Sequence, residues 1–374
     1  MKRKPTFSRR RLIGGAGTSI TALGAATLST GLAGSLAAPA VRAESRFEWK
    51  MVTSWPVDAP GPGTTAARLA RRITEGSGGR LTVKVFGAGE LVPAFEVFDA
   101  VSSGTAELGH TASLFWAGKM AIAPIFTTAP FGLLPEGHNA WIAYGGGQAL
   151  WDELYGPFGV KPYLAGNSGF QMAGWYRRKI EGLEDLKGLK IRAAGLGGEI
   201  LRRLGAAPVV IPPGEIFTAL KTGTIDAAEF LGPWSDTALG LNKAAPYYYW
   251  PGFDKPNGSA EALVNAKALA ALPAELRSLV ETACEAENAR GLAEADWYNA
   301  QSLQGLEAGG TTLLRFPEPV LQAAKREAEG VMDTVAAKDP LYGRILESWR
   351  AARTASIAWG RVSRHALLDA QLAS

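Results

Sequence analysis

Residues 186–226 contain the sequence LKGLKIRAAGLGGEILRRLGAAPVVIPPGEIFTALKTGTID, which decides the fold class. Two short runs within it, 190–192 and 208–211, predict β-strands. Residues 198–204 and 214–221 carry apolar side chains at helical spacing and predict helices. Strands that alternate with helices of this length are typical of α/β units on mostly parallel sheets.

The N-terminal part of the chain repeats this scheme. Residues 47–51 and 81–86 alternate between apolar and polar side chains, as strands with one buried face do. Helices are predicted over residues 64–74 and 94–102, and each is followed by glycine. The chain is therefore predicted to contain two α/β halves.

Two short segments in these halves resemble each other: residues 100–107 have the sequence AVSSGTAE and residues 219–226 have ALKTGTID. In both, the pattern predicts the end of a helix, a glycine that can take a positive φ, and a strand that bears an acidic residue. The glycines are Gly104 and Gly223. Because the segments occupy corresponding places in the two halves, we expect two lobes with a cleft between them.

After Pro273 the composition changes. Residues 273–307 are rich in Ala, Glu, Leu and Arg and predict a long helix that ends at paired glycines. A strand over residues 311–316 and helices over 319–337 and from 342 to the C-terminus follow. We expect such long terminal helices to brace the lobes or to join a partner subunit.

The N-terminus predicts an export signal that is not part of the fold. Residues 1–43 hold seven lysines and arginines and no acidic residue. The arginines at 9–11 precede a mild apolar run over 12–40, and Val41-Arg42-Ala43 offers the small residues that signal peptidase needs. This pattern resembles a twin-arginine signal, although the general export route remains an alternative. An uncleaved anchor is the other reading, but a run this rich in Gly and Ser partitions poorly into hydrocarbon.

Charge and metal-ligand counts exclude several classes of protein. The formal charge is +4, and without residues 1–43 it is −3, so the interpretation as a nucleic-acid-binding protein, which needs a basic face on the folded part, loses its main support. Cys284 is the only cysteine, so no intramolecular disulfide can form. His110, His138 and His365 show no metal-ligand spacing, which argues against a built-in iron–sulfur, zinc or haem site.

Several segments together resemble the substrate-binding receptors of TRAP (tripartite ATP-independent periplasmic) transporters, in the branch that binds small 2-oxo or 2-hydroxy carboxylates. These segments are 49–56 (WKMVTSWP), 166–176 (GNSGFQMAGWY), 186–195 (LKGLKIRAAG), 223–233 (GTIDAAEFLGP) and 247–256 (YYYWPGFDKP). The resemblance implies a periplasmic binding protein fold, in which two α/β lobes joined by long helices close over a ligand. It also implies a periplasmic receptor that delivers a small organic acid to an integral-membrane TRAP permease.

The expected domain organisation follows from these observations. Residues 1–43 form a cleaved export signal. Lobe I spans 44–167 with part of 257–320, lobe II spans 168–256, and residues 321–374 form C-terminal bracing helices. The C-terminal helix is also a candidate for homodimer formation.

The resemblance implies three substrate-binding residues, Gln171, Arg192 and Phe230. The arginine of the KIR segment holds the ligand carboxylate, and a planar guanidinium suits this role because it donates two parallel hydrogen bonds. The amide of Gln171 contacts the ligand or a cation, since it can both donate and accept. Phe230 stands where relatives often have tryptophan, so it keeps the ring and lacks the indole donor.

The resemblance also implies a cation site in which Glu229 offers its carboxylate and Phe230 its backbone carbonyl oxygen. Na⁺ and Ca²⁺ prefer such oxygen ligands and could bridge to the ligand. Lys255 departs from this pattern, because relatives tend to have an oxygen-bearing side chain near that position. Either its ammonium group takes the place of the cation, or Asp254 is the ligand and Lys255 lies in solvent; the sequence leaves both open.

An exported hydrolase or lyase acting on small carboxylic acids is the alternative function. Such an enzyme needs a nucleophile with a base, or a metal-held water. No G-x-S-x-G motif is present, and Cys284 lies in a predicted helix. A receptor without catalytic activity is therefore the expected function, and the identity of its acid stays open.

Overall fold

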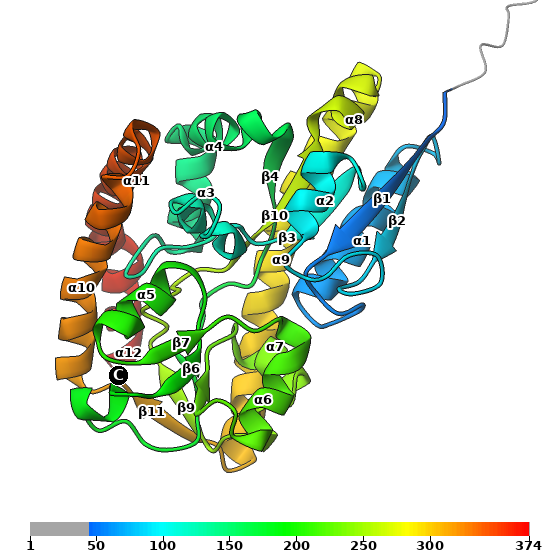
Figure 1. Cartoon of the computed structure of the whole chain (residues 1–374). Coiled ribbons are helices and arrows are strands. Elements are labelled where there is room, and N and C mark those ends of the chain that lie inside the picture. Colours follow the sequence, from blue (N-terminus) through cyan, green and yellow to red (C-terminus); the bar gives the residue numbers. More distant parts are fainter. Residues whose placement is uncertain (1–44, 374) are drawn as a thin grey trace, which may run out of the picture. The chain divides into compact units, whose positions relative to one another are not determined.

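The computed structural model describes residues 45–373, so the predicted export signal over residues 1–43 lies outside this part of the chain. Two β-sheets form in the described part (Figure 1). The first sheet has the strand order β2-β1-β3-β10-β4, with bounds Leu81–Phe86, Phe47–Thr53, Leu108–Thr111, Ser259–Asn265 and Val160–Asn167. The second sheet has the order β11-β9-β5-β8-β6-β7, with bounds Thr312–Arg315, Tyr247–Trp250, Gly174–Tyr176, Ala227–Ala228, Lys190–Arg192 and Ala207–Val209.

Helices accompany both sheets. The first eight are α1 (Pro62–Gly76), α2 (Val97–Ser103), α3 (Pro135–Tyr144), α4 (Gly147–Tyr155), α5 (Gly195–Arg203), α6 (Ile216–Thr222), α7 (Pro233–Ala238) and α8 (Ala266–Ala271). The C-terminal part adds α9 (Ala274–Ala308), α10 (Glu318–Ala336), α11 (Pro340–Gly360) and α12 (Ala366–Leu372). The α/β class with two lobes and long connecting and C-terminal helices, expected from the sequence, is confirmed. Within residues 45–373, no helix has both the length and the apolar character that crossing a bilayer requires.

Both sheets are mixed, and five strand pairs among residues 45–373 are parallel, so the expectation of mostly parallel sheets holds by a narrow margin. Four strand pairs in the described residues are antiparallel, and each of them involves β5 or β10. These are the strands that the chain enters directly after passing from one sheet to the other. The neighbouring parallel strands run toward the other sheet, so a strand that starts from that side must run against them. The α/β pattern of the sequence could not reveal this, because the direction depends on the passage between sheets.

The two similar segments of the sequence fold into matching turns. Gly104 and Gly223 both take left-handed backbone angles at the ends of α2 and α6, with φ of 81° and 78°. The carboxylate of Glu107 accepts a 2.8 Å hydrogen bond from the backbone N–H of Lys50, on the neighbouring strand. Asp226 accepts a 3.0 Å bond from the N–H of Lys190 in the same way. The sequence similarity therefore corresponds to a shared local structure.

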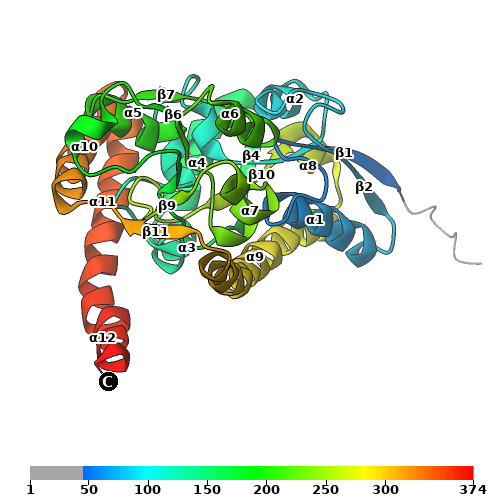
Figure 2. The ribbon, with the colours of Figure 1, turned by 90° about the horizontal axis from the view of Figure 1, so that it is seen from below.

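Helix α9, of 35 residues, connects the elements of the two sheets. It packs on β4 and α1 of the first-sheet region and on α7, which follows β8 (Figures 1 and 2). Arg68 on α1 donates to Glu287 at 2.6 Å and, with both terminal nitrogens, to Glu294 at 3.0 and 2.8 Å. A helix of this length spans about 50 Å, enough to tie distant elements together.

The C-terminal helices pack on one another and extend beyond the sheets. Helix α10 contacts α5, and α11 contacts α3, α4 and α10. Figure 2 shows the end of α11 and α12 projecting away from the rest of the described chain. Large apolar side chains are exposed along this projection, which we call the C-terminal arm (residues 357–372): Ile357, Trp359, Val362, Leu367, Leu368 and Leu372.

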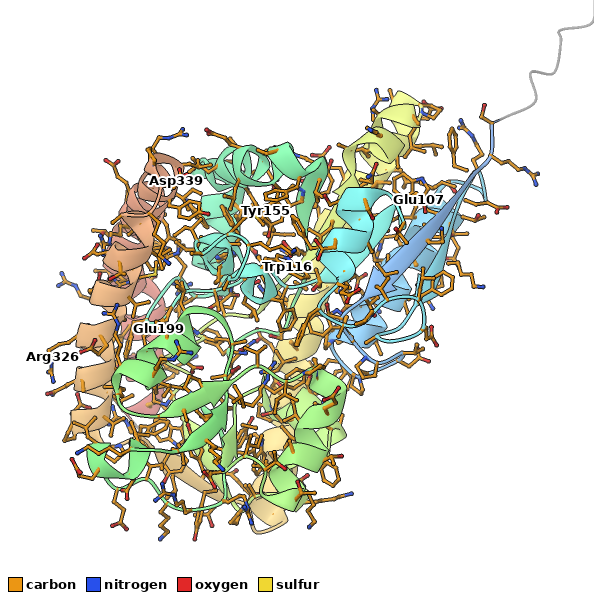
Figure 3. The ribbon with its side chains drawn as sticks, in the orientation of Figure 1. Glu107, Trp116, Tyr155, Glu199, Arg326 and Asp339 are labelled. Atoms are coloured by element: carbon orange, nitrogen blue, oxygen red, sulfur yellow. The ribbon has the colours of Figure 1, made fainter. Side chains whose placement is uncertain are left out.

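Glu261 on β10 is a carboxyl group in the core of the first-sheet region. One oxygen accepts a 2.6 Å hydrogen bond from Trp116 Nε1 and the other a 3.1 Å bond from the Tyr155 hydroxyl (both aromatic residues are labelled in Figure 3). Burial nevertheless raises the pKa of Glu261 to about 8, because it penalises the charged form more than these donors stabilise it. The folded protein therefore holds a proton on this group at neutral pH.

Candidate functional site

The chain passes between the two sheets at residues 168–173, which link β4 to β5, and at residues 251–258, which link β9 to β10. We call these the crossing segments. They lie against each other, with the backbone N–H of Ser168 donating to the carbonyl oxygen of Gly258 at 2.9 Å. A Cβ at Gly258 would collide with Ser168 Oγ, and one at Gly252 with the carbonyl oxygen of Gln171. Close approach of backbone therefore requires glycine at 252, whereas a side chain at 258 would displace Ser168 and Gln171 from their positions at the cavity.

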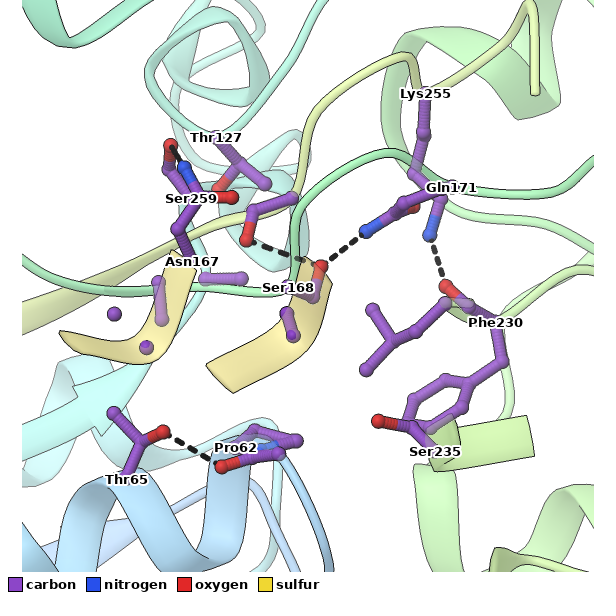
Figure 4. Close-up of a pocket in the computed structure, with 18 of the residues that line it drawn as sticks. Pro62, Thr65, Thr127, Asn167, Ser168, Gln171, Phe230, Ser235, Lys255 and Ser259 are labelled. Atoms are coloured by element: carbon purple, nitrogen blue, oxygen red, sulfur yellow. Dashed lines mark hydrogen bonds between the residues drawn. The ribbon is translucent and has the colours of Figure 1, made fainter. Parts of the chain in front are cut away.

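A cavity of about 50 Å³ lies beside the crossing segments (Figure 4). Its wall is mainly apolar, from Trp55, Leu114, Phe115, Phe230, Leu231 and Trp234. Polar and charged side chains line the rest: Thr65, Thr127, Asn167, Ser168, Gln171, Arg192, Ser235, Lys255, Ser259, Glu294 and Asn299. The cavity thus brings Gln171, Arg192, Phe230 and Lys255 together, all of which the sequence analysis singled out.

Arg192 is the last residue of β6 and is 2% exposed. Its Nη1 donates to the backbone carbonyl oxygen of Glu229 at 2.7 Å, and its Nε donates to that of Ile211 at 3.3 Å. These bonds fix the plane of the guanidinium and leave Nη2 without an acceptor among residues 45–373. Burial lowers the pKa of Arg192, and the nearby carboxylate of Glu229 opposes that shift. Arg192 thus has two N–H donors to offer at the cavity.

Lys255 is buried, at 4% exposure, which excludes the alternative that places it in solvent. Its Nζ donates to the backbone carbonyl oxygen of Phe230 at 2.6 Å (dashed in Figure 4) and forms an ion pair with the carboxylate of Glu229. Arg192 Nη1 lies 3.6 Å from the other oxygen of Glu229. Neither oxygen of Glu229 accepts a hydrogen bond from other described residues, so the two cations balance its buried charge.

Asp254, the ligand in the other alternative, does not line the cavity. It is 3% exposed, and burial together with the charge of Glu229 raises its pKa to about 7. A Cβ at Gly197, in α5, would lie 2.9 Å from the Asp254 Cβ. The side chain of Asp254 therefore packs against α5, whereas that of Lys255 contributes to the cavity wall.

Gln171 and Phe230 complete the set predicted from the sequence. The amide nitrogen of Gln171 donates to Ser168 Oγ at 2.7 Å, whereas its buried amide oxygen has no partner in the described structure. The Phe230 ring lies 5.7 Å from the guanidinium carbon of Arg192, within range of a cation–π contact. One unpaired acceptor and one apolar face therefore lie beside the two cationic groups.

Other cavity residues were not singled out from the sequence. Asn167 ends β4 and donates to Asn257 at 2.9 Å, and Asn257 donates to Ser259, the first residue of β10, at 3.0 Å. Asn167 and Ser259 lie at strand ends that face the other sheet, and ligands bind at such edges. This position could have marked them as candidate cavity residues from the sequence. Glu294 and Asn299 come from α9, and no local pattern marks them as cavity residues.

Comparisons with known proteins place these observations in context. Residues 52–339 match the DctP family model, described as bacterial extracellular solute-binding protein, family 7. Over 315 residues, 84% of this chain and 86% of the relative, the chain is 42% identical to a monocarboxylate 2-oxoacid-binding periplasmic protein of a Nostoc species.

Several solved structures have the same fold as this chain. A TRAP transporter solute-binding protein from Bordetella bronchiseptica, a mixed-occupancy dimer with copurified calcium and picolinate, is 39% identical, with a TM-score of 0.86 over 88% of this chain and 98% of that one. One from Colwellia psychrerythraea, with calcium and pyruvate, is 36% identical, with a TM-score of 0.84 over 87% and 99%. One from Pseudoalteromonas atlantica, with sodium and pyruvate, is 35% identical, with the same TM-score and coverage.

The cations in those relatives raise the question of whether this cavity fits one. Hard cations need several oxygen ligands, and Glu229, the Phe230 carbonyl and the amide oxygen of Gln171 are oxygen donors of that kind. The ammonium group of Lys255 already contacts two of them, Glu229 and Phe230. Its positive charge would repel a metal ion at the same oxygens. The donor set of this chain therefore does not fit Na⁺ or Ca²⁺.

Proposed function

Because this chain belongs to the DctP family of bacterial extracellular solute-binding proteins, it is a receptor and not an enzyme, and we propose that its ligand is a small 2-oxo or 2-hydroxy monocarboxylate. We further propose that the ligand binds in the cavity beside the crossing segments and is handed to the membrane subunits of a TRAP permease. The observation that carries this proposal is the buried Arg192, which lines that cavity and whose Nη2 has no acceptor within residues 45–373.

Charge favours a monoanion. Arg192 and Lys255 each carry one positive charge at the cavity, and Glu229 carries one negative charge between them. Glu294, another ionisable group of the wall, is paired with Arg68. The site thus has one net positive charge, which a single carboxylate neutralises, whereas a dicarboxylate would leave a buried negative charge without a partner.

The volume of the cavity also favours a small monocarboxylate. A cavity of about 50 Å³ holds on the order of four water-sized groups, at ~10–15 Å³ each. An acid of the size of pyruvate or lactate fits this space, and a sugar acid does not. We propose that its carboxylate accepts from Arg192 and that its carbon chain packs on Phe230. A 2-hydroxy group would donate to the unpaired amide oxygen of Gln171, whereas a 2-oxo oxygen would accept from the second N–H of that amide.

The proposed lobes follow the two sheets. We propose that residues 44–167 with part of 257–320 form lobe I around the first sheet and that residues 168–256 form lobe II around the second. Strand β11 pairs with β9 of the second sheet and so accompanies lobe II. Residues 321–374 would brace this pair, as the contacts of α10 with α5 and of α11 with α3 and α4 favour.

The proposed location is the periplasm, reached through cleavage of an export signal over residues 1–43. The family description as extracellular proteins supports it, and so does the arginine cluster of the sequence. Fractionation of cells that express the full chain, with mass spectrometry of the exported product, tests this proposal. A mature N-terminus at Glu44 in the periplasmic fraction is expected, and an unprocessed chain in the membrane fraction would contradict it.

We also propose that the C-terminal arm pairs with the arm of a second copy. Its apolar side chains are more than half exposed, from 53% at Leu368 to 72% at Leu372, on helices that project from the chain. The Bordetella relative crystallised as a dimer, which supports a second copy of this chain as the occupant.

Calorimetry with a panel of acids tests the proposed ligand class. Pyruvate and lactate are expected to bind, whereas succinate and a hexuronate are not. A ligand at 100 times its dissociation constant should add about 2.7 kcal/mol of stability, so thermal shift gives a second measurement. Binding of the dicarboxylate in preference to every monocarboxylate would overturn the charge argument.

A further inference from the structure

We infer that the ammonium group of Lys255 serves as a built-in counter-cation, so that this receptor binds its monocarboxylate without a metal ion. The inference deepens the proposed function and rests on it, since it concerns the same ligand. Relatives with 35–39% identity were crystallised with calcium or sodium and with picolinate or pyruvate.

The first step in the argument is the need for positive charge at Glu229. This carboxylate is 1% exposed, and apart from its ion pairs with Lys255 and Arg192 it has no polar partner among the described residues. A buried carboxylate without a cation or donors is strongly unfavourable, so something positive must accompany it. Arg192 lies 3.6 Å away, at the limit of an ion pair, and Lys255 forms the closer one. In this chain a side chain therefore supplies the charge that Glu229 requires.

The second step is the hydrogen-bond capacity of Lys255. An ammonium group has three N–H donors. The carbonyl oxygen of Phe230 takes one at 2.6 Å, and the ion pair with Glu229 directs a second toward its carboxylate, which leaves the third without an acceptor in the described part of the chain. Because Lys255 lines the cavity with Arg192, both can donate to the same bound acid. The remaining donor of Lys255 would contact the carboxylate or the 2-oxo oxygen.

The third step is the rigidity of the backbone that carries Lys255. Two residues before it, the carbonyl oxygen of Phe253 accepts from the N–H of Phe131 at 2.7 Å, and the two rings stack at 5.5 Å. Phe253 also packs against Phe316 at 5.5 Å. These contacts hold the crossing segment in place, so the ammonium group is positioned before any ligand arrives. Such positioning reduces the entropy cost of binding.

The test measures pyruvate affinity of the purified protein by calorimetry in three buffers: sodium-free with chelator, with added Ca²⁺, and with added Na⁺. The wild-type dissociation constant is expected to agree within about twofold among them. A loss of tenfold or more on chelation and sodium removal would overturn the inference, as would saturable heat when Ca²⁺ is titrated into the pyruvate complex.

Two variants extend this test. Lys255→Gln is expected to weaken binding in the metal-free buffer by tenfold or more and to recover part of it with Ca²⁺ or Na⁺, because an amide oxygen joins Glu229 in an oxygen site. Lys255→Met removes the charge without offering oxygen and should not recover. Lys267→Gln, at an exposed lysine, is the matched control and should match wild type. Unchanged metal-free affinity in folded Lys255→Gln would contradict the inference.

The outcomes separate this inference from the proposed function. If monocarboxylates bind only with a metal present, the ligand class holds and the role of Lys255 is wrong. If none of them binds in any of the three buffers, the proposed function fails, and the inference falls with it. The wild-type comparison needs no variant, so it decides the matter even if Lys255→Gln does not fold.

Discussion

At the scale of the residue, the cavity depends on a few buried charges held by hydrogen bonds to backbone carbonyl oxygens and by ion pairs with one another. Arg192 is fixed by two carbonyl oxygens and still has donors to offer. Glu229 is held between two cations. Each of these groups is costly to bury alone, and together they leave one positive charge for an anion. Substitutions here should therefore affect affinity more than the same changes at the surface.

Arg192→Lys is expected to weaken pyruvate binding by at least about thirtyfold, because removing one side of a buried hydrogen-bonded charge pair costs on the order of 2–5 kcal/mol. Lysine keeps the charge but lacks the planar pair of donors. Calorimetry measures the affinity, and circular dichroism checks that the variant folds. Arg202→Lys, at an arginine whose side chain is 60% exposed, is the control. Wild-type affinity in folded Arg192→Lys would remove this residue from the site.

Glu261 makes stability depend on pH. Its pKa is raised to about 8, whereas in the unfolded chain it is near the ordinary 4.5. Between about pH 5 and pH 8 the unfolded chain loses this proton and the folded protein keeps it, so stability should fall as pH rises, by up to about 1.4 kcal/mol per unit. Glu261→Gln should flatten that decline. Denaturant unfolding at several pH values measures it, with Glu285→Gln, at an exposed carboxyl on α9, as control.

Asp236 and Asp254 also make the free energy of unfolding fall as pH rises, because burial raises their pKa values to about 6 and about 7. The slope of Glu261→Gln should therefore be smaller than that of wild type without reaching zero. A variant whose stability falls with pH as steeply as wild type would show that Glu261 is ionised in the folded protein.

At the scale of the element, the crossing segments decide whether the cavity forms. Gly252 and Gly258 allow residues 251–258 to lie against residues 168–173. Gln171 and Lys255 each belong to one of these segments, so the approach of the two backbones also fixes the distance between two cavity residues. A change in that approach should alter both stability and ligand affinity.

Gly252→Ala tests this coupling. The added Cβ would meet the backbone carbonyl of Gln171, which cannot rotate away as a side chain could, so a loss of about 1–3 kcal/mol in unfolding free energy is expected, with weaker pyruvate binding. Gly305→Ala in α9 is the matched control: nothing lies within 4 Å of the added Cβ, and alanine should stabilise the helix by about 0.5–1 kcal/mol. Equal effects of the two substitutions would contradict this account.

Much of the element structure could be predicted from the sequence, because local patterns determine it. The strand over residues 190–192 and the two left-handed glycines occur where the patterns predict them. The directions of β5 and β10 could not be predicted, since they depend on how the chain passes between sheets. Among cavity residues, those on the quoted motifs could be named, whereas Glu294 and Asn299 could not, because their helix reaches the cavity only through long-range packing.

At the scale of the whole molecule, the C-terminal arm sets the expected assembly. Apolar side chains that stay in water on a projecting helix mark an interaction surface. Trp359→Glu with Leu367→Glu should convert a dimer into a monomer, because charges cannot be buried against an apolar partner without large cost. Light scattering after gel filtration measures the mass. Pyruvate affinity should not change, since neither residue lines the cavity.

Tyr144→Glu is the control for this experiment. Tyr144 is 93% exposed and lies at the end of α3, outside the arm, so its charge should leave the mass unchanged. A wild-type protein that is monomeric at every concentration would show that the arm has another partner or none.

The matching turns after α2 and α6 have an evolutionary consequence. The two turns share structure as well as sequence. In both, a left-handed glycine precedes an acidic side chain whose carboxylate accepts a hydrogen bond from the backbone N–H of a lysine on the adjoining strand. This correspondence is the pattern expected if the two halves arose by duplication of one ancestral unit. The turn should then be portable between the halves. A chimera in which residues 219–226 replace 100–107 should therefore fold. The common origin of the two turns would then remain visible in the structure after their sequence similarity has faded.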